Sequence, residues 1–420
     1  MEGKVSTYKV LAECFKGAYD MLQQPAFVLL KDYMEGAYQR SKEGGAIAWT
    51  NFAMPPELFW AMDVYPVVVD LISGFQAGWN PGRMLEYIDL AHEYVPDYVC
   101  ANNKAFLGVL LSKDLDPPDI FVVPSNPCDA NLSAYPAMSR LLDLPYHVIG
   151  TPYFGRSERA IEYMASEWLK LISVLEEMTK RKLDLDKLRQ VIRYSNVAHD
   201  YSRKLGKLRQ NIPCPQSSSD MFMDGGLLMA MAGTPQLVDY FKMQYETVKA
   251  KAEAKDKPLT DFVQRIRLVW SYGSIAFDPM LLPWMEQEFG AISVCAYSSN
   301  WLVEPWQVQD NSDLHDMVRH LARKMVMVPM TRECHGPWEN FSEATIDMAR
   351  RYHADAVIFG GHVACKSSWA IAKLVKDRIY DVLGIPTMNV ELDMFDSRVA
   401  SSDQLKATFT EFLTVNFPKS

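Results

Sequence analysis

Three cysteines each follow a short apolar run that is typical of a β-strand. Cys100 follows residues 98–99, Cys128 follows residues 120–123 and Cys365 follows residues 356–360. In an open parallel sheet the carboxyl ends of the strands converge on one crevice, so thiolates from distant parts of the chain can meet there around iron. The pattern predicts a metal cluster held by three protein sulfurs, which leaves one iron free for substrate.

The spacing of the cysteines leaves a second interpretation open. No two of these three are two to four residues apart, as paired zinc thiolates usually are, and they lack the compact spacing of ferredoxin motifs. Each could instead be a small buried hydrophobic residue. Cys214 and Cys334 lie in loop-like contexts from which they could reach the same crevice and extend a cluster. Cys14 and Cys295 are expected in the core.

Composition restricts the class of protein. The 420 residues carry 52 acidic and 43 basic side chains, and this acidic balance disfavours a nucleic-acid partner. No apolar stretch is long enough to span a membrane, and the first nine residues lack the apolar segment of a signal peptide, so we expect a cytoplasmic protein. Seven cysteines in that compartment are expected to stay reduced, for burial or metal ligation.

Apolar patterning predicts an α/β protein with two parallel-sheet units. Strand-like runs alternate with helical stretches in two regions, which favours parallel sheets. The predicted strands are 46–52, 65–69, 98–100, 120–123, 146–149, 268–271, 291–297, 325–328, 356–360 and 387–392. The predicted domains are an N-terminal helical segment (1–45), a first α/β domain (46–157), a helical connecting region (158–262) and a second α/β domain (263–420).

Several motifs occur in an order that resembles the 2-hydroxyacyl-CoA dehydratase and benzoyl-CoA reductase family. The resemblance covers about residues 45–415 and is spread over several moderately specific motifs. They are Trp49-Thr50-Asn51-Phe52-Ala53-Met54-Pro55-Pro56-Glu57-Leu58, the Cys100 segment with Gly108, Asn126-Pro127-Cys128-Asp129-Ala130, His362-Val363-Ala364-Cys365-Lys366, and Gly384-Ile385-Pro386 followed by 391–398.

The resemblance implies a subunit of an oxygen-sensitive, anaerobic iron-sulfur enzyme acting on an acyl-CoA thioester. Each catalytic subunit of this family has two flavodoxin-like domains and holds a [4Fe-4S] cluster between them. Carried over to this chain, the cluster ligands are Cys100, Cys128 and Cys365. The resemblance also implies a homologous second subunit, as in a heterodimer, and a separate ATP-hydrolysing activator that donates electrons. The chain has no Gly-rich phosphate loop, in keeping with ATP being used by another polypeptide.

Each electron placed on a substrate must be followed by a proton or by loss of hydroxide, so proton-carrying side chains are the next candidates. His362, three residues before Cys365, is placed to hydrogen-bond a cluster sulfur or the substrate, or is only structural. Asp70 ends a predicted strand and could face the cleft. Glu57 follows two prolines and is either catalytic or only a cap for the next helix. Lys366 could tune the cluster or contact a CoA phosphate.

Three activities fit these residues. The favoured one is an ATP-dependent reductase of an aromatic acyl-CoA, of the benzoyl-CoA reductase type, an oxidoreductase. The alternative is a subunit of an (R)-2-hydroxyacyl-CoA dehydratase, a lyase that eliminates water through a ketyl radical. Phe52 beside Thr50 favours the aromatic substrate, and Trp49, Phe59 and Trp60 would suit its ring. A third possibility is an electron-transfer or scaffold subunit whose cluster never contacts substrate.

Overall fold

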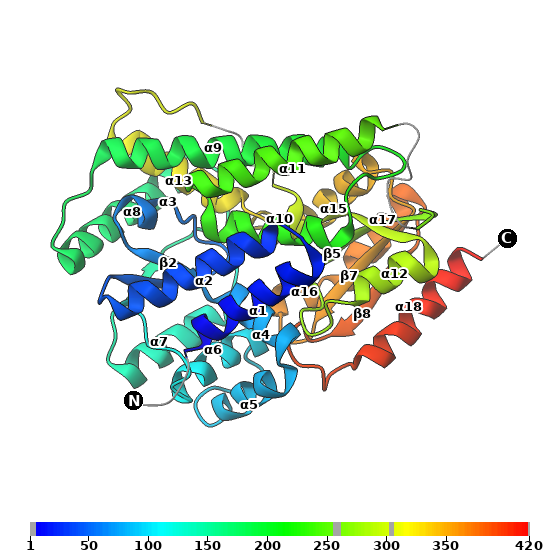
Figure 1. Ribbon diagram of the computed structural model, residues 1–420, viewed down its shortest axis with the longest axis horizontal. Helices are drawn as coiled ribbons and strands as arrows, with labels where there is room; N and C mark the ends of the chain where they lie inside the picture. The colour runs from blue at the N-terminus through cyan, green and yellow to red at the C-terminus, as the bar shows by residue number, and fades with distance from the viewer. Residues whose placement is uncertain (1–5, 255–261, 302–305, 419–420) are drawn as a thin grey trace.

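Two four-stranded parallel sheets form the framework of the computed structural model, which describes residues 6–254, 262–301 and 306–418 (Figure 1). The first sheet has strand order β2-β1-β3-β4 and the second has order β6-β5-β7-β8. We call each sheet with its covering helices a lobe. The structure confirms the predicted α/β class, and the two lobes are consistent with two flavodoxin-like domains. Residues 1–5, which belong to the segment examined for a signal peptide, lie outside the described ranges.

Every strand pairs in parallel with its neighbours. The bounds of the strands are β1 Ile47–Thr50, β2 Tyr65–Val68, β3 Ile120–Pro124, β4 Tyr146–Ile149, β5 Ile266–Tyr272, β6 Ala291–Ala296, β7 Ala356–His362 and β8 Thr387–Leu392.

Helices fill the connections between these strands. Their bounds are α1 Thr7–Leu22, α2 Ala26–Lys42, α3 Glu57–Ala61, α4 Val69–Trp79, α5 Pro81–Ala91, α6 Ala101–Leu111, α7 Asn131–Leu142, α8 Glu158–Thr179, α9 Leu185–Leu208, α10 Ser218–Met231, α11 Pro235–Glu253, α12 Leu281–Phe289, α13 Leu314–Met327, α14 Thr331–Cys334, α15 Glu339–Arg351, α16 Lys366–Trp369, α17 Ala372–Leu383 and α18 Ser402–Asn416.

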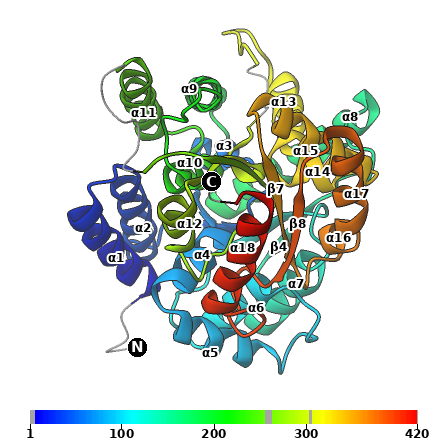
Figure 2. The same cartoon turned by 90° about the vertical axis from the view of Figure 1, so that its right-hand side faces the viewer.

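Each sheet has an apolar core on both of its faces, because the side chains of each strand point alternately to one face and to the other. In β1, Trp49 packs into one apolar cluster and Ala48 into another, because successive side chains of a strand point to opposite faces. In the second sheet, α12 and α18 cover one face while α15 and α17 cover the other (Figure 2). Sheets buried on both faces consist of nearly continuous apolar runs, which made most strands recognisable in the sequence.

Two predicted strands are wrong. Residues 98–100 form a turn in which the Val99 N–H donates to the Pro96 carbonyl, and Cys100 is the N-cap of α6. Residues 325–327 are the end of α13 and Val328 is its C-cap, and the buried side chains of this helix recur at helical spacing from Met317 to Val326. A four-residue apolar run has no period of its own, so the longer helical pattern before it decides its structure.

The helical middle of the chain joins the lobes. Helix α10 contacts β2 of the first sheet and β6 of the second, and α9 and α11 lie side by side (Figure 1). Helix α13, although it follows β6 in the chain, packs against α8 and contributes to the apolar cluster of the first sheet. The predicted domain boundaries stay a prediction. Among the described residues, no helix combines the length and apolar character needed to cross a membrane.

Candidate functional site

The three predicted cysteines lie at the carboxyl edges of the two sheets. Cys100 precedes the first residue of α6, which leads into β3, and Cys128 follows the end of β3 by four residues. Cys365 follows the end of β7 by three residues and is the N-cap of α16. The fold therefore brings two thiols from the first lobe toward one from the second.

Contacts between the lobes bring these thiols toward one place. His362, three residues before Cys365, lies against Cys100. Lys366 pairs with Asp129 beside Cys128.

Burial raises the pKa of the Cys100 thiol far above its ordinary value, and the charges of Asp393 and Cys365 raise it further. Burial also raises the pKa of the Cys128 thiol, and Cys100 and Cys365 raise it further. Neutral thiols are therefore favoured here unless a positive centre binds them, since a metal ion deprotonates a coordinating thiol.

Two of the sulfurs have a buried side chain as a hydrogen-bonding partner. His362 Nε2 lies 2.9 Å from Cys100 Sγ. The amide N–H of Met394 donates to His362 Nδ1 at 3.2 Å, so in neutral histidine the proton is on Nε2 and points at the sulfur. The carboxylate of Asp393 lies 3.4 Å from Nδ1. The Tyr272 hydroxyl donates to Cys365 Sγ at 2.9 Å.

Asp70 lies in the first turn of α4 and belongs to the same site. Its carboxylate accepts the Phe52 amide N–H at 2.9 Å and the Asn102 side-chain amide at 2.6 Å. Burial raises the pKa of Asp70 to about 6, although the two hydrogen bonds favour the charged form and lower the pKa. Asn102 is two residues after Cys100, so its hydrogen bond ties Asp70 to the Cys100 segment. A carboxyl with this pKa can change protonation state near neutral pH.

Cys334 is a fourth thiol at the site, and Cys214 is not. Burial raises the pKa of Cys334, and its neighbours Cys365, Glu333 and Cys128 raise it further. Cys214 lies elsewhere, where its amide N–H donates to Gln264 Oε1 at 2.7 Å. The remaining two cysteines, Cys14 and Cys295, lie on α1 and in the buried strand β6.

Glu57 lies at a different place. Its carboxylate forms a buried ion pair with Lys324 of α13 and accepts the Ser195 hydroxyl of α9 at 2.5 Å. The expected helix cap is wrong, because the first residue of α3 places its side chain toward α13 and makes no capping hydrogen bond. Among the described residues, no hydrogen bond or ion pair joins Glu57 to the cysteines.

Exposed charged and aromatic side chains form the rim of the cysteine site. Lys366, directly after Cys365, pairs with Asp129, directly after Cys128, at 3.1 Å. The Lys366 ammonium also lies 4.6 Å from the ring centre of Tyr98. Three loops from the two lobes therefore meet at one exposed lysine.

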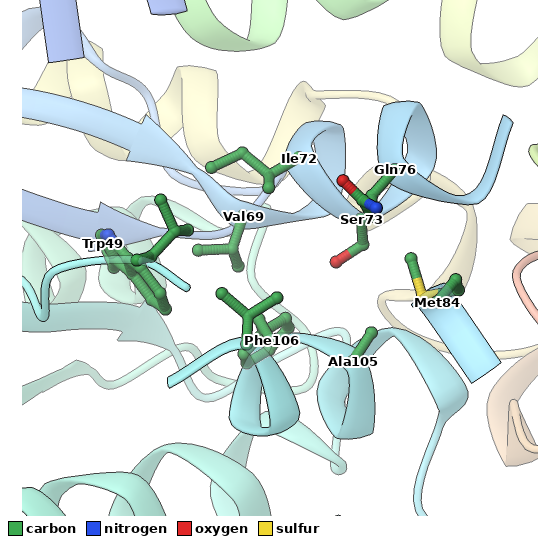
Figure 3. A pocket seen from close by; sticks show the side chains of 10 residues that line it. Trp49, Val69, Ile72, Ser73, Gln76, Met84, Ala105 and Phe106 are labelled. Carbon is green, nitrogen blue, oxygen red and sulfur yellow. The ribbon is translucent and has the colours of Figure 1, made fainter. Parts of the chain in front are cut away.

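A small apolar cavity lies away from these residues, between β1, α4, α5 and α6 (Figure 3). Trp49, Ile72 and Phe106 line it, and Ser73 and Gln76 are its polar side chains. None of the predicted cluster ligands or proton-carrying residues lines it. Trp49 and Phe59, which were expected to suit an aromatic substrate, are fully buried in core clusters, and Thr50 is buried in β1.

Comparison with protein-family models matches residues 51–415 to the family described as 2-hydroxyglutaryl-CoA dehydratase, D-component. The chain belongs to this family. The match covers most of the chain, including all four cysteines of the site.

Three curated relatives of this dehydratase family are distant in sequence. The chain is 23% identical to the (R)-2-hydroxyisocaproyl-CoA dehydratase alpha subunit of Clostridioides difficile over 53% of the chain and 56% of the relative. It is 25% identical to the (R)-phenyllactyl-CoA dehydratase alpha subunit of Clostridium sporogenes over 49% and 53%. It is 22% identical to the lactoyl-CoA dehydratase subunit alpha of Anaerotignum propionicum over 88% and 90%. The chain thus spans about half the length of the first two relatives.

These comparisons confirm the resemblance at the level of the family. All three relatives are named as dehydratase subunits, so they favour the dehydratase alternative over the benzoyl-CoA reductase type that the aromatic residues suggested.

Two residues of the site were missed in the sequence. Tyr272 ends β5 and reaches Cys365, and Tyr297 follows β6 and stacks on Tyr272 with ring centres 5.6 Å apart. Both tyrosines come directly from the carboxyl ends of strands, the same signal that pointed to the cysteines. Buried aromatic residues are so common in cores that this signal does not single them out.

Proposed function

We propose that this chain is the cluster-binding subunit of a 2-hydroxyacyl-CoA dehydratase, corresponding to the alpha subunits of its relatives. The substrate is a 2-hydroxyacyl-CoA thioester, which loses water. A homologous second subunit completes the enzyme, and a separate ATP-hydrolysing activator supplies electrons. The observation that carries this proposal is the contact of the Cys100 and Cys128 segments of one lobe with the Cys365 segment of the other, through His362 and through the Lys366–Asp129 pair, in a chain that belongs to the dehydratase family.

The donor set fits an iron-sulfur cluster better than a single ion. Among the described residues, no three His, Cys, Asp or Glu side chains are grouped closely enough to hold one metal ion. The thiolates around a [4Fe-4S] cluster each bind a different iron, so they stand further apart. We assign Cys100, Cys128 and Cys365 as ligands. The hydrogen bonds from His362 and Tyr272 would stabilise negative charge on two of these sulfurs.

When bound, the cluster supplies one-electron chemistry and a Lewis-acidic iron at the substrate. The chain's own residues handle protons. Asp70 is held by Phe52 and Asn102 in one orientation, and with a pKa of about 6 it can accept a proton at neutral pH. His362 is fixed between Met394 and Cys100 and serves to orient the sulfur.

Anaerobic iron and sulfide analysis of the freshly purified chain tests the proposal. We expect iron and sulfide in the wild type and their loss or conversion in the Cys100→Ser, Cys128→Ser and Cys365→Ser variants. Cys295→Ser is the matched control, because it changes a buried cysteine of β6 outside the site and should reduce stability while the iron is retained. Near-zero iron and sulfide in the wild type, or equal iron in all four variants, would overturn the proposal.

A second measurement separates the three activities. Electron paramagnetic resonance is recorded on the reduced protein with a 2-hydroxyacyl-CoA, with benzoyl-CoA and without thioester. A dehydratase subunit that binds its substrate at the cluster should respond to the 2-hydroxyacyl-CoA. A response to benzoyl-CoA alone would favour the reductase, and no response to either thioester would favour an electron-transfer subunit.

A further inference from the structure

A tyrosine at the end of strand β5 is held against one of the assigned cluster ligands. The Tyr272 hydroxyl lies 2.9 Å from Cys365 Sγ and 4.0 Å from the sulfur of Met330. A phenol has one proton to donate, so the much shorter contact with Cys365 takes it. Tyr272 is itself only 1% exposed. The hydroxyl proton is therefore directed at the sulfur of Cys365.

A register shift in β5 turns Tyr272 toward this sulfur. Trp270 pairs with Ile358 of β7, whereas Tyr272 pairs with the very next residue, Phe359, so one residue of β5 is extra. Strict alternation would place Tyr272 on the same face of the sheet as Trp270. Instead, Tyr272 packs with Cys365 in the apolar cluster of the other face. Irregularities of this kind re-aim a side chain and are common next to active sites.

Three aromatic rings hold the phenol in this orientation. The ring of Tyr297 lies 5.6 Å away and that of Phe359 lies 5.8 Å away, both nearly parallel to the ring of Tyr272. Phe341 of α15 packs its ring edge-on at 5.7 Å. Because Phe359 belongs to β7, the strand that leads to Cys365, the phenol and the ligand are placed by the same element. In so close a packing the hydroxyl cannot leave the sulfur without displacing these neighbours.

A donor on a ligand sulfur has a direct consequence for a bound cluster. Hydrogen bonds to the sulfurs are among the features that set the reduction potential of an iron-sulfur cluster. Reduction adds negative charge, and a hydrogen bond is stronger when its acceptor carries more of that charge. The donor therefore stabilises the reduced state more than the oxidised state, and this raises the potential.

We propose that Tyr272 is a positioning residue for the cluster, which orients the Cys365 thiolate and raises the reduction potential through its hydrogen bond to this sulfur. The inference rests on the proposed function and deepens it. It leaves the three-ligand set and the iron that is open to substrate unchanged. A cluster without this donor is harder for the activator to reduce.

An anaerobic redox titration followed by electron paramagnetic resonance tests this role. We compare the purified wild type with Tyr272→Phe, which keeps the ring and removes the hydroxyl. The midpoint potential of the variant should be more negative. We expect about a tenfold lower ratio of reduced to oxidised cluster at a fixed potential, the effect of one hydrogen bond, which is a shift of about 59 mV for one electron. A purely structural tyrosine would leave the midpoint where it is.

Tyr352→Phe is the matched control. Tyr352 is buried in the same apolar cluster but follows the end of α15. Its carbonyl accepts from Arg267 at the beginning of β5, so it lies at the opposite edge of the sheet from Cys365. This variant loses a hydroxyl from the same core and should keep the midpoint potential of the wild type.

Replacing Tyr272 by 3-fluorotyrosine guards against a phenylalanine variant that loses its iron. The fluorinated ring keeps the shape and the hydroxyl but makes the phenol a stronger donor, so the midpoint should move to a less negative potential. An unchanged midpoint in this protein, or in Tyr272→Phe with full iron content, would overturn the inference and leave the cluster in place. An equal shift in Tyr352→Phe would also overturn it. Absence of iron from the wild type would instead overturn the proposed function, and this inference with it.

Discussion

Single side chains at the thiol site combine sulfur, hydrogen-bond donors and one carboxyl of raised pKa. Sequence patterns together with the family resemblance pointed to Cys100, Cys128, Cys365, His362 and Asp70, which lie at or near the ends of apolar runs. The sequence named Cys334 together with Cys214 but gave no means of choosing between them, since both are in loop-like contexts. Tyr272 was not selected, because it is one aromatic residue among many.

Asp70 gives a prediction at this scale for the protein without a bound cluster. Its folded pKa of about 6 lies above the ordinary value of 3.8 because burial disfavours the charged form. Between these two pH values the unfolded chain releases the proton while the folded protein keeps it, so the free energy of unfolding falls as pH rises. Below pH 3.8 the effect is absent, and above about pH 6 the loss is complete.

Asp70→Asn should remove this dependence. The variant loses one hydrogen bond at every pH, a constant offset of about 1 kcal/mol, but its stability relative to the wild type should improve as pH rises from 4 to 7. Urea unfolding across this range measures the difference. Burial raises the pKa of Asp224 to about 7, so this residue also makes the free energy of unfolding fall as pH rises. The contribution is the same in both proteins and cancels in the difference between them. A difference that stays constant with pH would contradict the prediction.

At the scale of elements, strands were more predictable than the ends of helices. Eight of the ten predicted runs overlap the strands of the structure, because parallel strands buried on both faces are continuous apolar segments. The packing of α13 was not predictable, since its partner α8 lies about 150 residues earlier in the chain. Nothing local in the sequence indicates that a helix after β6 covers the first sheet.

The ion pair of Glu57 with Lys324 joins helices α3 and α13, and Ser195 links α9 to the same pair. Both side chains are completely buried, and Ser195 hydrogen-bonds with both. Replacing Lys324 by methionine leaves the Glu57 carboxylate buried without a countercharge, so we expect a loss of about 3–5 kcal/mol in the free energy of unfolding. The double variant Glu57→Leu with Lys324→Met removes both charges and should lose much less.

Urea unfolding of the wild type, Glu57→Leu, Lys324→Met and the double variant gives a double-mutant cycle, which measures the coupling energy of the pair. The double variant also tests the candidate catalytic role of Glu57. If the residue is structural, this variant should keep the iron content and dehydration rate of the wild type. Additive single losses, with no coupling between the two positions, would contradict the structural interpretation of the pair.

For the whole molecule, the site is the place where two equivalent lobes meet. Loops of both lobes carry the thiols, and the Lys366–Asp129 pair, the Tyr153 hydroxyl and Arg156 cross between them there. The Lys366–Asp129 pair is exposed on both sides, so it contributes at most about 1 kcal/mol. A cluster bound by both lobes would therefore be a stronger link than this surface contact, because metal binding by the folded state adds directly to its stability.

Removal of the cluster should accordingly loosen the junction and leave the lobes folded. We expect anaerobic chelation of iron to lower the midpoint of thermal unfolding and to speed amide hydrogen exchange in the four cysteine loops, 98–102, 126–130, 330–336 and 363–367. Peptides from the buried strand β5 and from α8 are the internal control and should exchange at unchanged rates, because their hydrogen bonds lie within one lobe. Faster exchange of 363–367 together with 98–102 and 126–130 would show that the cluster holds the two lobes together. Protection that is unchanged in all four loops would mean that no group bridges the lobes.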